Sequence, residues 1–214
     1  MERMRSGVTL VELMVVVALI GVLAALSGIQ LDSWLDAGRL KARARQVADS
    51  FLFARTEALR TGDVHLVVMQ QALGTEPTLV IARDGSLASM DCNVDPSEIV
   101  HALYEVSQVG WGTSLSQAAG TQAPDDQGLA LSNVENGSSF TDASRMPQSS
   151  ATWFAFTPDG MPRLFSPGAC APLGSIGHGA GAVYLTNQSR DYAVVLSPLG
   201  TVRVHVWNGT SWTL

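Results

Sequence analysis

Basic residues are scarce over most of this sequence. The chain has 214 residues and a single lysine, and charged residues make up only 15% of it. Beyond Gly62 there are five arginines and 13 acidic residues, so this distal part has a formal charge of −8. A surface of that sign offers no broad attraction to phosphate groups, which argues against a domain built mainly to bind nucleic acid.

Cysteine is scarce as well, since the chain has only Cys92 and Cys170. No second cysteine or histidine lies close in sequence to either of them, so the spacing does not indicate zinc. In a chain exported across a membrane, an even pair indicates a disulfide, which would add roughly 3–5 kcal/mol by the chain-entropy relation. Two unpaired buried thiols are the alternative.

The sequence also lacks the residue constellations typical of an enzyme or a metal site. His65 and His205 fall inside predicted strands, which favours a structural role in a sheet over catalysis. Asp91 and Asp95 belong to an alternating acidic stretch like that of a calcium loop, but Pro96 replaces the glycine that an EF-hand requires. We therefore predict no enzymatic activity, no cofactor and no metal, and an ordinary polar turn is favoured over a looser calcium site.

A long apolar run occupies the start of the chain, uninterrupted from Leu13 to Leu26. As a helix, Val8 to Ile29 would extend about 33 Å, enough to cross a hydrocarbon core of about 30 Å. Arg3 and Arg5 precede the run and predict that its N-terminal side is cytoplasmic. The remainder of the chain is then expected on the other side of the membrane.

One acid, Glu12, lies just before the apolar run. An acid deep in hydrocarbon costs about 2.5–3.5 kcal/mol, and no lysine or arginine within the helix is placed to pair with it. Cleavage after Gly7 would give Val8 a free amine, which could pair with Glu12 of the same chain or of a neighbouring subunit. Pairing with Glu12 of a neighbouring subunit would allow this segment to guide the assembly of subunits.

Gly7, an apolar residue and the stretch TLVEL at 9–13, with basic residues before the glycine, resemble the class III signal of type IV pilins and pseudopilins. The resemblance implies that a prepilin peptidase cuts between Gly7 and Val8 and methylates Val8, and that Glu12 guides subunit stacking into a filament. It also implies other pilins, an inner-membrane assembly platform and the inner membrane as partners. Val8 departs from the phenylalanine or methionine usual in the family, and an ordinary signal anchor is the alternative.

Apolar residues at spacings of three and four predict that the helix continues beyond the membrane and ends with Gly62 as its left-handed cap. This predicted face consists of Leu40, Ala44, Val47, Phe51, Ala54 and Ala58. Four basic residues lie mostly off the face, which favours a solvated surface over contact with lipid headgroups or DNA. They are Arg39, Lys41, Arg43 and Arg45.

Short β-type runs follow the helix. Strands are predicted at 64–70, 78–83, 152–157, 163–166, 182–186, 192–197 and 202–207. Residues 99–106 fit a strand or a helix, and 129–134 is a possible strand. Pro158-Asp159-Gly160 and Pro198-Leu199-Gly200 predict two hairpin turns.

These patterns predict an α+β fold in which a long N-terminal helix packs on an antiparallel β-sheet domain, as in the type IV pilin-like fold. The expected parts are a leader at 1–7, a transmembrane and filament-core helix at 8–29, its amphipathic continuation at 30–62 and a periplasmic β-rich domain at 63–214. An assembly role, without catalysis, is the expected mechanism.

Three distal segments resemble the GspH/FimT-type minor pseudopilins, namely 51–68, 154–165 and 192–207. The resemblance implies a GspH-like subunit of a type II secretion pseudopilus. A FimT/FimU-like minor pilin, acting in type IV pilus assembly, adhesion or DNA uptake, is the alternative. Residues 91–150 depart most from the family, so any partner-specific surface is expected there.

Overall fold

The computed structural model describes residues 9–69, 77–104, 106–114, 121–128, 137–140, 153–164 and 179–214. The side chains of residues 24–34, 77, 78 and 153 lie outside this description. The chain divides into two compact units, Met1–Gly38 and Arg39–Leu214.

The helix α1 extends from Leu10 to Thr61. The first proline of the sequence is Pro77, so no residue of α1 lacks the backbone N–H that the helix needs. The helix ends where Gly62 adopts a φ of +74° and donates its N–H to the carbonyl oxygen of Ala58 at 3.0 Å. The predicted glycine cap is confirmed, because an L side chain at this φ would be strained.

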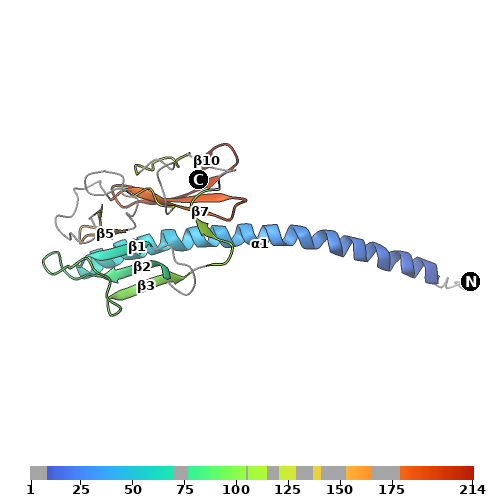
Figure 1. Cartoon of the computed structure of the whole chain (residues 1–214), viewed down its shortest axis with the longest axis horizontal. Coiled ribbons are helices and arrows are strands. Elements are labelled where there is room, and N and C mark those ends of the chain that lie inside the picture. Colours follow the sequence, from blue (N-terminus) through green and yellow to red (C-terminus); the bar gives the residue numbers. More distant parts are fainter. Residues whose placement is uncertain are drawn as a thin grey trace, which may run out of the picture. The chain divides into compact units, whose positions relative to one another are not determined.

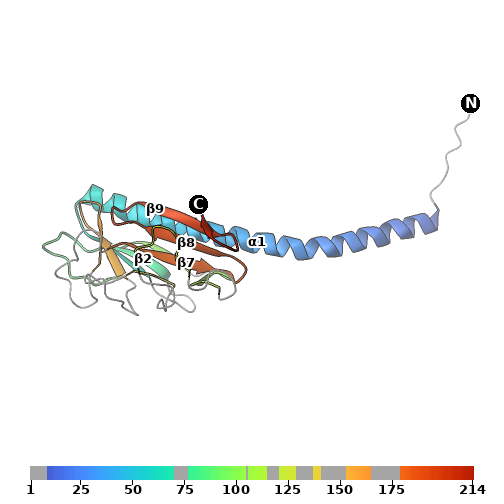
Figure 2. The same ribbon diagram turned by 90° about the horizontal axis from the view of Figure 1, so that it is seen from above.

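Among the described residues, ten strands follow α1 in chain order. Figure 1 labels several of them. The ten strands are β1 (His65–Met69), β2 (Pro77–Arg83), β3 (Ile99–Tyr104), β4 (Gly110–Trp111), β5 (Trp153–Phe156), β6 (Pro162–Arg163), β7 (Gly181–Thr186), β8 (Asp191–Leu196), β9 (Val202–Trp207) and β10 (Trp212–Thr213). Sheet A has the order β3-β2-β1-β5-β6, and sheet B has the order β10-β9-β8-β7-β4. The strand pairs are antiparallel, and Figure 2 shows β7, β8 and β9 side by side.

The prediction of an α+β fold is confirmed, and the described antiparallel strands form two sheets. Every residue of β1 and of β8 is buried, so both faces of these strands need a covering layer. Residues 99–104 form a strand, which settles the helix-or-strand alternative for that segment. The possible strand at 129–134 lies outside the described residues.

The main core of the second unit combines α1 with both sheets. The six apolar residues predicted to line one helix face, from Leu40 to Ala58, are all fully buried. They share one hydrophobic cluster with Val67, Ile81 and Phe154 of sheet A and with Val183, Val194 and Leu196 of sheet B. In Figure 1, β2 and β3 are drawn below this half of α1 and β7 above it.

Arg43 is the exception among the four basic residues predicted to lie on a solvated surface of α1. Arg39, Lys41 and Arg45 are exposed as expected, but only 4% of Arg43 is accessible to solvent. Its guanidinium donates to the Gln46 side-chain oxygen at 3.4 Å, and burial lowers the pKa of Arg43. The solvated surface predicted for this residue is therefore wrong, because it lies at the border of the packed face.

The outer face of sheet A is covered by the loop that follows β2. Leu66 and Val68 of β1 pack with Cys92 of this loop in a second hydrophobic cluster. The buried Asp84 carboxylate holds the loop by accepting the backbone N–H groups of Asp91 at 3.0 Å and Cys92 at 2.9 Å. Desolvation by burial raises the pKa of Asp84.

The outer face of sheet B is covered by residues 121–128, named here the covering segment. Asp126 anchors it by accepting hydrogen bonds from the Tyr184 hydroxyl at 2.5 Å, the Ser139 hydroxyl at 2.7 Å and the Gly128 N–H at 2.9 Å. Burial and the neighbouring Asp126 charge raise the pKa of Tyr184, which keeps its phenol protonated as a donor. A Cβ at Gly128 would lie 1.8 Å from the Ser139 carbonyl oxygen, so this close approach requires glycine.

Asp126→Ala is expected to lower the free energy of unfolding by about 2–3 kcal/mol, since the fully buried Ser139 and Tyr184 hydroxyls lose their acceptor. Its neighbour Asp125 provides the matched control. Asp125 forms an ion pair with Arg203 in which both side chains are about half exposed, so Asp125→Ala should cost at most about 1 kcal/mol. Denaturant unfolding followed by tryptophan fluorescence measures both values, and equal losses would contradict the anchoring role.

Candidate processing and assembly site

The described chain begins at Thr9, the residue before the first turn of α1. Gly7 and Val8, the predicted cleavage and methylation residues, lie outside the described residues. The Thr9 hydroxyl accepts the backbone N–H of Glu12 at 3.2 Å, and the Thr9 carbonyl accepts the N–H of Leu13 at 3.1 Å. Thr9 is therefore the N-cap of the helix, and Glu12 occupies its first turn.

The Thr9–Glu12 spacing is that of a capping box, in which threonine precedes glutamate by three residues. The partial positive charge at a helix N-terminus favours a carboxylate in this position. The sequence interpretation assigned Glu12 a role but missed Thr9. The signal was present as a threonine three residues before the acid and just ahead of an apolar run.

Cleavage after Gly7 would leave this capping arrangement complete. The new first residue would be Val8, and the two described groups that cap the first turn, the Thr9 hydroxyl and the Thr9 carbonyl, both lie after the cut. In sequence, the new amine would lie four residues before Glu12. The helix end and the amine would both supply positive charge to the acid.

The first part of α1 has apolar side chains on every side. Between Leu10 and Leu23 the large apolar side chains are 49–75% exposed, so this part of the helix presents an apolar surface. Among the described residues, no helix combines the length and the apolar character needed to cross a membrane. The span expected over residues 8–29 is not confirmed and stays a prediction.

A comparison with protein-family models finds a match in this N-terminal segment. Residues 3–28 match the family model of the prokaryotic N-terminal methylation motif. The motif fits a type IV pilin-like protein. It implies processing by a prepilin peptidase, assembly with other pilins, and a membrane-anchored or pilus-associated location. No curated protein and no solved structure matches the chain.

Cys92 lies in the buried cluster on the outer face of sheet A. It forms a disulfide in the structure. Cys170, its predicted partner, lies outside the described residues, so the Cys92–Cys170 pairing stays a prediction.

The Cys92–Cys170 disulfide is expected to stabilise the distal domain by about 2–5 kcal/mol. Reduction with dithiothreitol should therefore lower the denaturant midpoint of the wild-type chain. In the double variant Cys92→Ser/Cys170→Ser the midpoint should start lower and no longer respond to reductant. A wild-type midpoint unchanged by complete reduction would contradict this contribution.

The two histidines predicted to be sheet residues are buried in strands, His65 in β1 and His205 in β9. Burial lowers the pKa of both imidazoles, which favours their neutral forms. The acidic stretch after β2 forms a polar turn in which the Asp91 carboxylate accepts the N–H of Asn93 at 2.9 Å. Within the described part of the chain, no three histidine, cysteine or acidic side chains are grouped to hold a metal ion.

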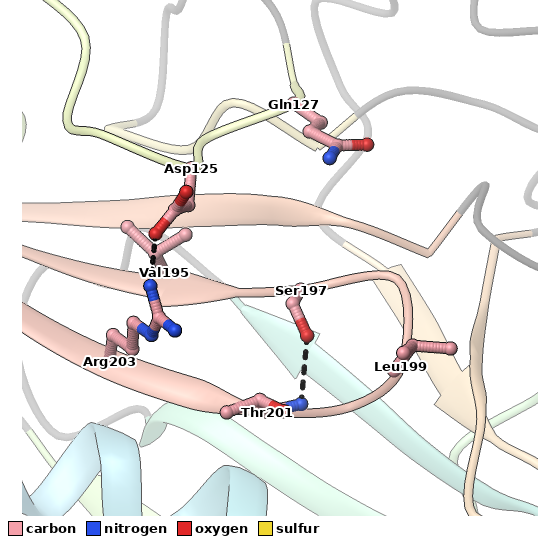
Figure 3. A pocket seen from close by; sticks show the side chains of 7 residues that line it. All are labelled: Asp125, Gln127, Val195, Ser197, Leu199, Thr201 and Arg203. Atoms are coloured by element: carbon pink, nitrogen blue, oxygen red, sulfur yellow. Dashed lines mark hydrogen bonds and ion pairs between the residues drawn. The ribbon is translucent and has the colours of Figure 1, made fainter.

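A pocket of about 260 Å³ opens beside the covering segment (Figure 3). It is lined by Asp125, Gln127, Val195, Ser197, Leu199, Thr201 and Arg203. Asp125 and Arg203 form an ion pair across it, and the Ser197 hydroxyl accepts the Thr201 N–H at 3.0 Å. These seven residues offer polar contacts to a small molecule but include no nucleophile paired with a general base.

Proposed function

We propose that this type IV pilin-like protein is a minor pseudopilin of the GspH-like type, a subunit of a type II secretion pseudopilus. In this role it is cut between Gly7 and Val8, methylated at Val8 and built into a short filament. The observation that carries the proposal is the capped first turn, which places Glu12 at the start of an apolar helix within the methylation motif.

The proposed mechanism is assembly, without catalysis. In the filament, the apolar surface between Leu10 and Leu23 packs against the helices of neighbouring subunits in place of lipid. Among the described residues, a Cβ added at Gly21 would meet nothing within 4 Å, so the glycine leaves room for a close helix neighbour. The charge pair between Glu12 of one subunit and the Val8 amine of the next fixes their axial register.

The proposed location is the bacterial inner membrane, crossed once, with the distal domain in the periplasm and later on the pseudopilus. Arg3 and Arg5 on the N-terminal side support this orientation. The disulfide at Cys92 supports an oxidising compartment for the distal domain. The negative charge of the distal part favours protein partners over nucleic acid.

Deletion of the gene in its host tests whether the protein serves a type II secretion pseudopilus or a type IV pilus. A secretion pseudopilin predicts that folded exoproteins accumulate in the periplasm and that the wild-type gene restores their release. Normal exoprotein release, together with loss of surface pili or of DNA uptake, would contradict the proposal and favour the FimT/FimU-like alternative.

A further inference from the structure

The covering segment contacts the outer face of sheet B at two anchored points along β9. At one point the Asp125 carboxylate forms an ion pair with Arg203 of β9 (Figure 3). At the other point the Trp212 indole N–H donates to the Thr121 carbonyl oxygen at 2.9 Å. Trp212 of β10 is paired with Trp207 of β9, and their ring centroids are 5.4 Å apart. The segment therefore passes over the part of β9 between Arg203 and Trp207.

His205 is the residue of β9 whose side chain lies between these two anchors. The valines of β9 pack against the main core, so the alternate residues Arg203, His205 and Trp207 point to the outer face of sheet B. The strand partner of His205 is Ala193 of β8, which shares a hydrophobic cluster with Ala123 of the covering segment. Only 3% of His205 is accessible to solvent. The imidazole is thus buried between the sheet and the covering segment.

The buried ring of His205 has no hydrogen-bond partner for either nitrogen among the described residues. A neutral imidazole has one N–H donor and one bare nitrogen, so burying it without partners already costs free energy. A protonated imidazole would bring two N–H donors and a full charge to the same place, which costs considerably more. Burial accordingly lowers the pKa of His205. This position therefore accepts the neutral ring and opposes its protonation.

The covering segment and β9 place one charge of each sign near His205. Burial has the largest effect on the pKa of the ring, while the Asp125 carboxylate acts to raise that pKa and the Arg203 guanidinium acts to lower it. Asp125 and Arg203 already form an ion pair with each other. After protonation of His205, one carboxylate would face two cations. The ion pair that anchors the covering segment would therefore be weakened next to the new buried charge.

Two further acids on this side of sheet B are already engaged by hydrogen-bond donors. Asp126 of the covering segment accepts the hydroxyls of Tyr184 and Ser139. Asp191 of β8 is fully buried on the same outer face and accepts the backbone N–H of Ser114 at 3.0 Å. The Tyr184 phenol is itself protonated and neutral. Neither acid is therefore placed to receive the protonated ring without giving up the donors that it holds.

We propose that the covering segment is a pH-sensitive switch, which opens more readily when His205 is protonated and then uncovers the outer face of sheet B. In the open form water hydrates the imidazolium, so its pKa returns toward the ordinary value of about 6.5. Because the pKa is lower in the closed form, opening is favoured as the pH falls below about 6.5. Tyr184 and Trp212 would then become accessible to solvent or to a partner. This switch belongs to the distal domain and does not depend on the proposed assembly through the N-terminal helix.

Hydrogen exchange of the full chain in detergent micelles, measured at about pH 7.5 and about pH 5.5, tests the proposal. Exchange over residues 121–128, corrected for the intrinsic effect of pH on amide exchange, reports the opening equilibrium of the covering segment. We expect this equilibrium to rise about tenfold at the lower pH, the factor for a group of pKa about 6.5 that is protonated only in the open form. Residues 191–196 of β8 should change much less. No rise over 121–128, or an equal rise in both regions, would overturn the proposal.

Substitutions of the two buried histidines identify the titrating group. His205→Phe keeps a ring but cannot take up a proton, so the pH response over residues 121–128 should disappear. His205→Gln, which is also uncharged at both pH values, repeats the test with a polar side chain in case phenylalanine packs poorly. His65→Phe removes the buried histidine of sheet A and should leave the tenfold rise unchanged. A response that persists in both His205 variants, or that is lost in His65→Phe, would overturn the proposal.

Discussion

Glu12→Gln is expected to reduce incorporation of the protein into filaments about tenfold or more, while membrane insertion and cleavage after Gly7 continue. Glutamine keeps the size and hydrogen-bonding groups of the side chain but removes the charge that the Val8 amine of a neighbouring subunit would meet. Loss of one charge pair in a water-poor helix bundle corresponds to about a factor of ten or more in assembly. Quantitative immunoblots of sheared filaments and of the membrane fraction measure the ratio.

Thr9→Ala separates this charge effect from a simple weakening of the helix end. The substitution removes the N-cap hydroxyl that accepts the Glu12 N–H, which costs about 1 kcal/mol of helix stability, but leaves the carboxylate in place. We expect Thr9→Ala to assemble much better than Glu12→Gln. Wild-type incorporation of Glu12→Gln would show that the carboxylate charge has no role in assembly.

Phe51→Ala is expected to lower the free energy of unfolding of the distal domain by about 3–5 kcal/mol. Phe51 is fully buried in α1, and its ring meets those of Phe154 and Phe140 edge to face at centroid distances of 5.1 and 6.5 Å. The cavity left by alanine would lie where the helix contacts the sheets, so relaxation around it would be limited. Tryptophan fluorescence during urea unfolding measures the loss.

The neighbouring residue provides the control for this substitution. Leu52 follows Phe51 in the same helix but is 44% exposed, so Leu52→Ala removes little buried surface. Its effect should stay within about 1 kcal/mol. A similar loss in both variants would indicate that helix propensity, and not core packing, determines the stability of this region.

The parts of the fold that could be predicted from the sequence are those specified by local patterns. The two turns at Pro158-Asp159-Gly160 and Pro198-Leu199-Gly200 separate paired strands as expected, with φ of +73° at Gly160 and +77° at Gly200. The buried face of α1 follows from helical periodicity alone. In each case the signal lies within a few residues, so no knowledge of distant contacts is needed.

The features that were missed depend on contacts between distant residues. The two-residue strand β4 pairs with β7, more than 70 positions away in sequence, and has no pattern of its own. The covering segment has weak local patterning because its position is set by Asp126 contacting Tyr184 and Ser139. The burial of Arg43 likewise depends on the residues packed around it in the folded domain, and helical periodicity does not predict those residues.

The N-terminal site has some features that local sequence predicts and others that it does not. Gly7, Val8 and Glu12 form a compact motif, and the family comparison supports the interpretation over residues 3–28. The capping role of Thr9 is equally local and could have been predicted from its spacing to Glu12. The partner of the apolar helix surface and the pairing of Cys92 with Cys170 depend on residues or molecules beyond this local pattern.

The mass and first residue of the protein isolated from its host cells test the processing step on which the assembly mechanism depends. The expected result is a chain that begins at Val8 and carries one methyl group on its amine. A chain that still begins at Met1, or one that begins downstream of Ser27, would contradict the mechanism, since the amine that Glu12 is proposed to meet would not exist at that position.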